Sequence, residues 1–147
     1  MDEDGVIWCV DVSQSRQLLP AKFKEVLQEK FAYLFSVDML DFIGTLDDFD
    51  NFGKDMDFLL FFEPPSLDAR IVNQNAILSV MPNPDQIPSA YLAHYPHLCK
   101  RIIIPKKLKW RLRDLLDQDN VTERILFPGL DGLSDWLKRY YGPGGSP

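Results

Sequence analysis

The chain has 147 residues, 46% of them hydrophobic, and a formal net charge of −6 at pH 7. This length and apolar content are typical of one packed globular domain and exclude a disordered segment. The negative charge disfavours nucleic acid as a partner, and no apolar run is long enough to cross a membrane. Cys9 and Cys99 form no Cys-x-x-Cys pair, and no secretory signal precedes them. We therefore expect a cytoplasmic protein with both thiols reduced.

The charges are distributed unevenly along the chain. Residues 38–68 carry nine acids and one base, whereas residues 100–113 carry seven bases and no acid. Both stretches are interpreted as solvated faces of the fold. The alternative for the basic stretch is an anion-binding strip, formed by Lys106, Lys107, Lys109, Trp110 and Arg111.

The first half of the chain predicts one strand and three helices. Gly5–Val12 is β-branched and aromatic on both faces, which is typical of a central strand of a sheet. Pro20 suits the first turn of a helix, and apolar residues at helical spacing extend that helix to about Phe35. Two shorter helices are predicted, over residues 37–43 and from Thr45 to about Gly53.

The second half predicts three strands, at residues 57–63, 77–81 and 100–104. Its helices are expected over residues 67–72 with Ser66 as the cap, around Tyr91, after Pro105, and after Asp131, which caps the last helix. Because strands and helices follow no regular βαβ order, we expect an α+β fold. It should contain a small mixed or antiparallel sheet of about four strands, flanked by five or six helices. Residues 1–141 should form a single domain, and residues 142–147 a flexible tail.

The candidate site lies in residues 70–81, where polar side chains run directly into an apolar strand. Arg70, Asn73, Gln74 and Asn75 precede that strand. Every buried amide needs hydrogen-bond partners, so this cluster predicts either a structured corner or a binding site.

The other motifs are weaker. His94, His97 and Cys99 lie close in sequence, but a zinc site needs four ligands, and Pro96 interrupts any helix that would align the histidines. We expect no metal there. No Gly-x-Ser-x-Gly elbow and no phosphate-binding glycine loop occur in the sequence.

Four motifs resemble the C-terminal half of FRG-domain proteins. Arg70-Ile71-x-x-Gln74 before an apolar strand is similar to the family's Arg-Ile-x-x-Gln-x-Gly-x-Phe motif. Three further segments agree with the family in order and spacing: the strand at residues 5–10, the Ile-Ile-Ile-Pro step at 102–109 and the Phe-Pro-Gly-Leu-Asp-Gly-Leu segment at 127–133. Ala76 and Leu78 stand where the family favours Gly and Phe. The family's Phe-Arg-Gly and Gln-His-x-Gly motifs are absent, so the chain resembles the second half of such a domain.

The FRG family is similar to ADP-ribosyltransferase folds, so the resemblance implies an NAD-using transferase of the toxin or phage-defence type. By that analogy Gln74 holds a ribose or orients an acceptor and Arg70 locks the corner, which makes both candidate catalytic residues. Asn73 and Asn75 would contact the ligand. Because Gln takes up no proton, the general-base step would need another residue. The alternative is that Gln74 and Arg70 satisfy backbone groups at a helix-to-strand corner.

Two further functions remain open. The chain could be a non-catalytic interaction module, in which a protein partner or a second copy completes the sheet. The less favoured reading is nucleic-acid binding by the basic strip Lys100–Arg113 with Trp110, which predicts an affinity that falls steeply with salt.

Overall fold

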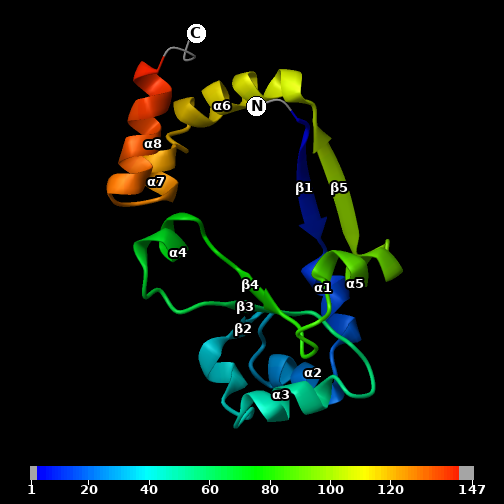
Figure 1. Ribbon diagram of the computed structural model, residues 1–147. Helices are drawn as coiled ribbons and strands as arrows, with labels where there is room; N and C mark the ends of the chain where they lie inside the picture. Colours follow the sequence, from blue (N-terminus) through cyan, green and yellow to red (C-terminus); the bar gives the residue numbers. More distant parts are fainter. Residues whose placement is uncertain (1–2, 143–147) are drawn as a thin grey trace. The chain divides into compact units, whose positions relative to one another are not determined.

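A computed structural model describes residues 3–142 of the chain (Figure 1). The α+β class is confirmed: the described residues form eight α-helices and five strands. The strands do not form one sheet, however. They divide into a two-stranded sheet, β1–β5, and a three-stranded sheet, β2–β3–β4. Residues 143–147 of the expected tail lie outside the described part of the chain.

The chain divides into two compact units, which we call the helical unit and the core unit. The helical unit contains residues 3–6, 66–76 and 103–142, and the core unit contains residues 7–65 and 77–102. That the two units form a single domain stays a prediction.

The core unit contains the three-stranded sheet and four of the α-helices. Its elements are α1 (Val12–Ser15), η1 (Arg16–Leu18), α2 (Ala21–Glu29), β2 (Phe35–Ser36), η2 (Val37–Leu40), α3 (Leu46–Phe52), β3 (Leu60–Glu63), β4 (Leu78–Val80) and α5 (Pro88–His94). Strand β2 runs parallel to β3, with Phe35 opposite Phe62. Strand β4 runs antiparallel to β3, with Val80 opposite Leu60. Helix α3 begins where the sequence predicts it, directly after Thr45, whose hydroxyl caps the helix by accepting the Asp48 N–H.

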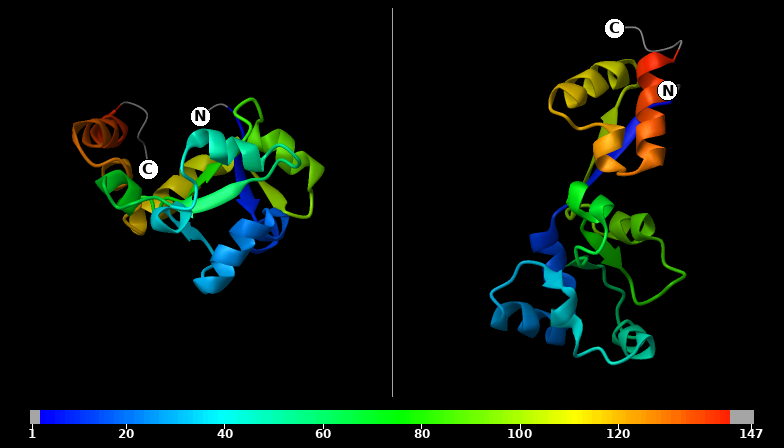
Figure 2. Two further views of the ribbon diagram at one scale, coloured as in Figure 1. Left: turned by 90° about the horizontal axis from the view of Figure 1, so that it is seen from below. Right: turned by 90° about the vertical axis from the view of Figure 1, so that its left-hand side faces the viewer.

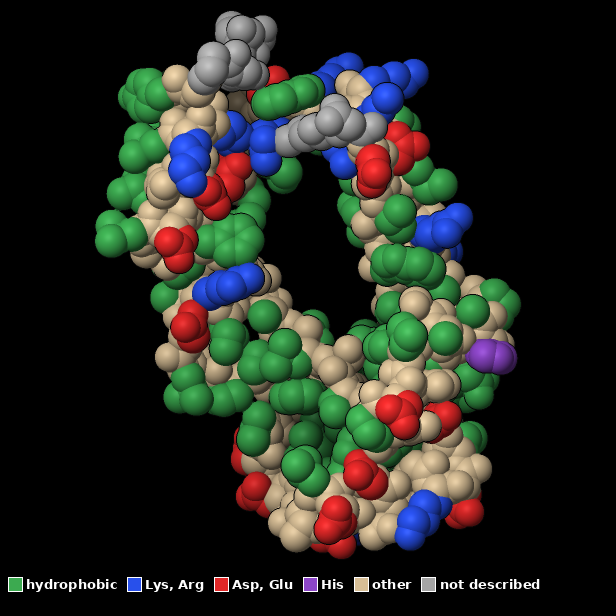
Figure 3. All heavy atoms as spheres, viewed as in Figure 1, with side chains coloured by type: hydrophobic (Ala, Val, Ile, Leu, Met, Phe, Trp, Pro, Cys, Tyr) green, Lys and Arg blue, Asp and Glu red, His purple; other side chains and the backbone are tan. Residues whose placement is uncertain are grey.

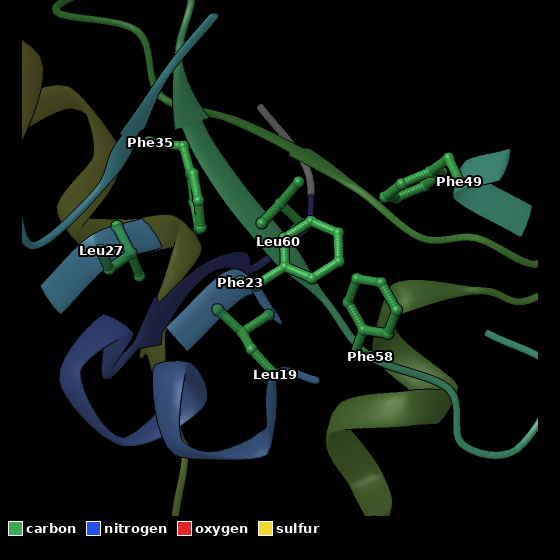
Figure 4. Close-up of a cluster of buried hydrophobic side chains, with 7 residues drawn as sticks. All are labelled: Leu19, Phe23, Leu27, Phe35, Phe49, Phe58 and Leu60. Atoms are coloured by element: carbon green, nitrogen blue, oxygen red, sulfur yellow. The ribbon is translucent and has the colours of Figure 1, made fainter. Parts of the chain in front are cut away.

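A phenylalanine cluster forms the larger of the two hydrophobic clusters of this unit (Figure 4). The Phe23 side chain on α2 is fully buried. Its ring centroid lies 5.1–6.5 Å from those of five other rings, Phe35, Phe42, Phe49, Phe52 and Phe58. Burying one such side chain contributes about 1.5–3 kcal/mol, and edge-to-face ring pairs add to this. The unit is therefore stabilised in the usual way, by a dry apolar interior.

Helix α2 ends at Glu29, so the prediction that it reaches Phe35 was wrong. Phe31 takes a left-handed conformation, with φ of 51°. The Ala32 N–H then donates to the Leu27 carbonyl oxygen at 2.9 Å, the closing bond of a Schellman motif. The Phe31 side chain is left 95% exposed. Its helical spacing predicted a core position, but the helix ends before Phe31, so the side chain does not lie on the buried face of the helix.

The expectation that β1 is a central strand was also wrong. Strand β1 (Gly5–Val10) pairs with β5 (Cys99–Ile104), and Figure 1 draws their arrows in opposite directions. A two-stranded sheet covers neither of its faces. Val6, Ile7 and Trp8 are consequently about half exposed. A partner strand that completes this sheet stays a prediction.

The helical unit is built mainly from α-helices. They are α4 (Ala69–Asn73), α6 (Lys109–Gln118), α7 (Glu123–Leu126) and α8 (Leu130–Tyr141), with η3 (Lys106–Leu108) directly before α6. Two predicted caps were wrong. Asp68, not Ser66, caps α4, because its carboxylate accepts the Arg70 N–H at 2.6 Å. Gly129, with φ of 115°, precedes α8, and Asp131 lies within the first turn.

Candidate functional site

The two amides at the end of α4 bind the end of α7. The Gln74 Nε2 donates to the Leu126 carbonyl oxygen at 2.9 Å, and the Asn73 Nδ2 donates to that of Ile125 at 2.7 Å. Ile125 and Leu126 are the last residues of α7, and carbonyls at a helix end lack partners within the helix. Asn73 and Gln74 therefore cap α7 from outside.

Arg70 adds a third contact between the same two segments. Its guanidinium lies over the ring of Phe127, 4.7 Å from the centroid, which is a cation–π geometry. Three of the four predicted site residues are thus brought together around the end of α7. Gln74 satisfies a backbone carbonyl, as the structural alternative expected, whereas the Arg70 guanidinium contacts an aromatic ring and no backbone group. Catalytic roles for Arg70 and Gln74 stay predictions.

Asn75 takes part through its backbone. Its φ of 46° is left-handed, and the Ala76 N–H donates to the Ile71 carbonyl oxygen at 3.1 Å. This is again the Schellman motif, in which Asn is a favoured second choice after Gly. Asn75 therefore ends α4, and ligand contact by its side chain stays a prediction.

Arg139 on α8 joins three helices, and the sequence did not single it out. Its guanidinium donates to both carboxylate oxygens of Asp117 on α6, at 2.6 and 2.8 Å. It also donates twice to Glu123 on α7, at 2.8 Å each. Arg113 approaches Glu123 as well, at 3.3 Å. Sequence patterns could not have found this cluster, because its members are up to 26 positions apart, from Arg113 to Arg139, and each alone looks like a surface charge.

The cluster shifts the pKa values of its members. Burial alone would raise the pKa of the Glu123 carboxyl, but the hydrogen bonds from Arg139 and the charges of Arg139 and Arg113 outweigh burial and lower it. The same hydrogen bonds with Glu123 and Asp117 raise the pKa of Arg139. The side chain of Arg139 is only 13% exposed, so the cluster is a partly desolvated clamp and not a loose surface pair.

Gly132 lets α8 lie directly on α7. Figures 1 and 2 show these two helices side by side. A Cβ added to Gly132 would overlap the Phe127 carbonyl oxygen and lie 2.8 Å from that of Glu123. Only glycine fits this contact between backbones.

The predicted basic strip lies on η3 and the first turn of α6, where Figure 3 shows Lys and Arg side chains gathered. Trp110 is 46% exposed, and the guanidinium of Arg113 lies 5.8 Å from its ring centroid. The Lys106 backbone N–H donates to the Asp4 carboxylate at 2.8 Å. No described carboxylate forms an ion pair with Lys106, Lys107, Lys109 or Arg111. Anion binding by this strip stays a prediction.

The helical unit lacks a hydrophobic core. Among its described residues only Thr122 and Gly132 are buried, and neither is a large apolar residue. Helices α6 and α8 are nevertheless amphipathic. The leucines of η3 and α6 are 37–48% exposed: Leu108, Leu112, Leu115 and Leu116. On α8 the exposed apolar residues are Leu130, Leu133, Leu137, Tyr140 and Tyr141.

His97 and Cys99 line an open hollow of about 280 Å³ in the core unit, together with Cys9, Asp11, Gln14 and Lys100. The Asp11 carboxylate caps α1, and hydrogen bonds from the Gln14 backbone and side chain lower its pKa. His94 points elsewhere, with Nδ1 2.8 Å from the Ala90 carbonyl oxygen. Nowhere in residues 3–142 do three or more His, Cys, Asp or Glu side chains form a group that could hold a metal ion.

No helix in the described part of the chain is both long and apolar enough to span a membrane. No protein-family model, curated protein or solved structure matches this chain significantly.

Proposed function

We propose that this protein is a non-catalytic protein-interaction module and that the helical unit carries its binding surface. One observation supports this function above the others: the amphipathic helices α6 and α8 bury no large apolar side chain within the described residues. Helices of 10 and 12 residues are marginal in water and normally take their stability from packing of an apolar face. A partner surface would supply that packing.

Polar contacts hold the helices in place without using their apolar faces. The amides of Asn73 and Gln74 bind α7, and Arg139 ties α7 to α6 and α8. Such contacts fix orientation, while the leucines remain free for binding. A rigid frame of this kind lowers the ordering cost when a partner binds.

The same contacts weigh against the enzymatic alternative. In an NAD-using transferase, the amides of Gln74 and Asn73 would turn toward a ligand. Each amide instead donates one of its two N–H groups to a backbone carbonyl of α7, which holds it against that helix. The FRG-domain resemblance and the use of NAD stay predictions.

Site-specific photo-crosslinking tests the proposed function. A photoreactive phenylalanine analogue replaces Leu112 on the apolar face of α6, and in a matched variant it replaces the exposed Asp114. Two residues are about 200° apart around a helix, so the two probes face opposite sides. In cells that express the full chain, we expect discrete protein adducts from position 112 and none from position 114. Equal labelling at both positions, or none at 112, would contradict the proposal.

A further inference from the structure

The charged side chains of η3 and α6 are placed unfavourably for the helix dipole. Bases occupy the N-terminal end, at Lys106, Lys107, Lys109 and Arg111, and Asp119 follows the last turn. The first turn of α6 contains no acid and its last turn no base. The four basic side chains at the positive end and the Asp119 carboxylate at the negative end therefore interact unfavourably with the dipole. The Asp4 carboxylate, which accepts the Lys106 backbone N–H, offsets part of this at the positive end.

Within the described residues, the Asp4 carboxylate binds the backbone N–H of Lys106 but forms no ion pair with the four basic side chains. Neither the four bases nor Asp119 forms an ion pair there, whereas Arg113 and Asp117, on the side of α6 that meets α7 and α8, do. The charges without an ion-pair partner therefore lie at the two ends of the exposed leucine stripe, which consists of Leu108, Leu112, Leu115 and Leu116.

A second copy of the same helix would satisfy both ends at once. Two antiparallel α6 helices with Leu112 of one against Leu116 of the other place Lys109 opposite Asp119, twice by symmetry. Arg111 lies at the same end and adds to this attraction. The two dipoles then oppose each other, and the leucine stripes cover each other. Such a contact is isologous and closes at two copies.

We propose that the protein forms a homodimer through antiparallel pairing of α6. This inference rests on the proposed function and names its partner as a second copy of the chain. An acidic protein of another kind would meet the bases but would leave Asp119 uncompensated. Four half-exposed leucines are fewer apolar contacts than a standard interface offers, so we expect a weak dimer, with Kd on the order of tens of micromolar.

Charge reversal on the two ends separates this arrangement from other associations. The first variant carries Lys109→Glu and Arg111→Glu, and the second carries Asp119→Lys. Each variant alone brings like charges together in the dimer, so we expect its Kd to rise by at least about tenfold. An equal mixture of the two variants pairs acids with bases at both ends. We expect sedimentation velocity to show the mixture dimerising with a Kd within about threefold of the parent value.

Both variants suit the helix dipole better than the parent, because they put acids at its N-terminus and a base at its C-terminus. We therefore expect thermal unfolding to occur at the same temperature as in the parent or higher, so lost dimerisation would not reflect lost folding. A parent chain that stays monomeric at several hundred micromolar would overturn the inference, and so would variants that dimerise like the parent.

The crosslinking at position 112 tells the two proposals apart. An adduct of twice the chain mass supports both. An adduct with a different protein overturns the homodimer and leaves the interaction function standing. The same conclusion follows if an adduct forms at position 112 but the charge variants dimerise like the parent. Absence of any adduct at 112 overturns both.

Discussion

The guanidinium of Arg139 and the carboxylate of Asp117 form a bidentate pair, with N–O distances of 2.6 and 2.8 Å. The pair joins α8 to α6, and the same guanidinium reaches Glu123 on α7. One side chain thus connects three helices in a unit that buries no large apolar residue among those described. In this unit, charge-assisted hydrogen bonds hold the helices together, as apolar packing does in the core unit.

Replacing Arg139 should therefore destabilise the helical unit more than a surface charge would. Arg139→Lys keeps the charge but loses the planar fork, and we expect a cost of about 1–2 kcal/mol. Arg139→Met leaves Asp117 without a partner and Glu123 with Arg113 alone, and should cost about 2–4 kcal/mol. Urea unfolding followed by Trp110 and Trp136 fluorescence, in a Trp8→Phe background, measures both.

The neighbouring Lys138 provides the control. It pairs with Asp135 at 3.4 Å, but its side chain is 74% exposed. We expect Lys138→Met to change the unfolding free energy by less than about 0.5 kcal/mol. Equal changes in unfolding free energy at positions 138 and 139 would contradict a stabilising role for the Arg139 contacts.

Stability of the helical unit should depend on pH through Glu123. The pKa of its carboxyl is lower in the folded protein than its ordinary value of 4.5. Below that value the unfolded chain binds more protons than the folded one, so stability falls as the pH falls. We expect a urea midpoint that is constant above about pH 5.5 and declines as the pH drops below 4.5 toward the lowered folded pKa. Glu123→Gln should flatten that decline, and an unchanged pH profile in this variant would assign it to other carboxyls.

The Gln74 amide should act as a donor to α7 and not as a catalytic group. Gln74→Glu removes the donor and places an oxygen against the Leu126 carbonyl, so we expect a loss of about 1–2 kcal/mol. Asn75→Gly should cost nothing, because glycine prefers the left-handed conformation found there. The same urea titration tests both, and a neutral Gln74→Glu would argue for a role outside folding.

Adding NAD should leave the thermal unfolding temperature of the parent unchanged. A ligand that binds the native state raises this temperature, and the two amides that the FRG resemblance offers to NAD are each held by a hydrogen bond to α7. A thermal scan with and without millimolar NAD is the measurement. A rise of several degrees that disappears in Gln74→Ala would instead favour the transferase reading.

Gly132→Ala should weaken the packing of α8 on α7. The added Cβ would collide with the Phe127 carbonyl oxygen, and overpacking of this kind costs about 1–3 kcal/mol. Alanine is the better helix former by about 1 kcal/mol, so an exposed glycine would show the opposite sign. Ser134→Ala on the same helix is the control and should be neutral or slightly stabilising. A stabilised Gly132→Ala would contradict the close contact.

The sequence predicted the elements whose signals are local. The helix from Thr45 to Gly53 and the strand before Pro105 both appear, because capping side chains, β-branched runs and proline act within a few residues. The end of α2 could not be predicted, since Phe31 stands where a glycine would have marked the turn. The structural alternative for Gln74 was foreseen as a type of contact. Its partner was not, because Leu126 lies 52 positions away.

The division of the strands into two sheets was equally beyond local signals. Val6, Ile7 and Trp8 read as a strand buried on both faces, yet they are about half exposed. An apolar pattern predicts that a surface is buried but does not predict which element buries it. The same holds for the leucines of α6.

The phenylalanine cluster also bears on the order in which the protein can fold during synthesis. All seven of its buried members lie between Leu19 and Leu60, so that interior can close on itself early in translation. The helical unit must instead join Asp4 to Lys106 and Asn73 to Ile125, and its clamp waits for Arg139. A ribosome-bound chain could therefore carry a closed phenylalanine cluster for some time before the binding surface exists. Partners should be able to recognise this surface only after the segment that carries Arg139 has been synthesised.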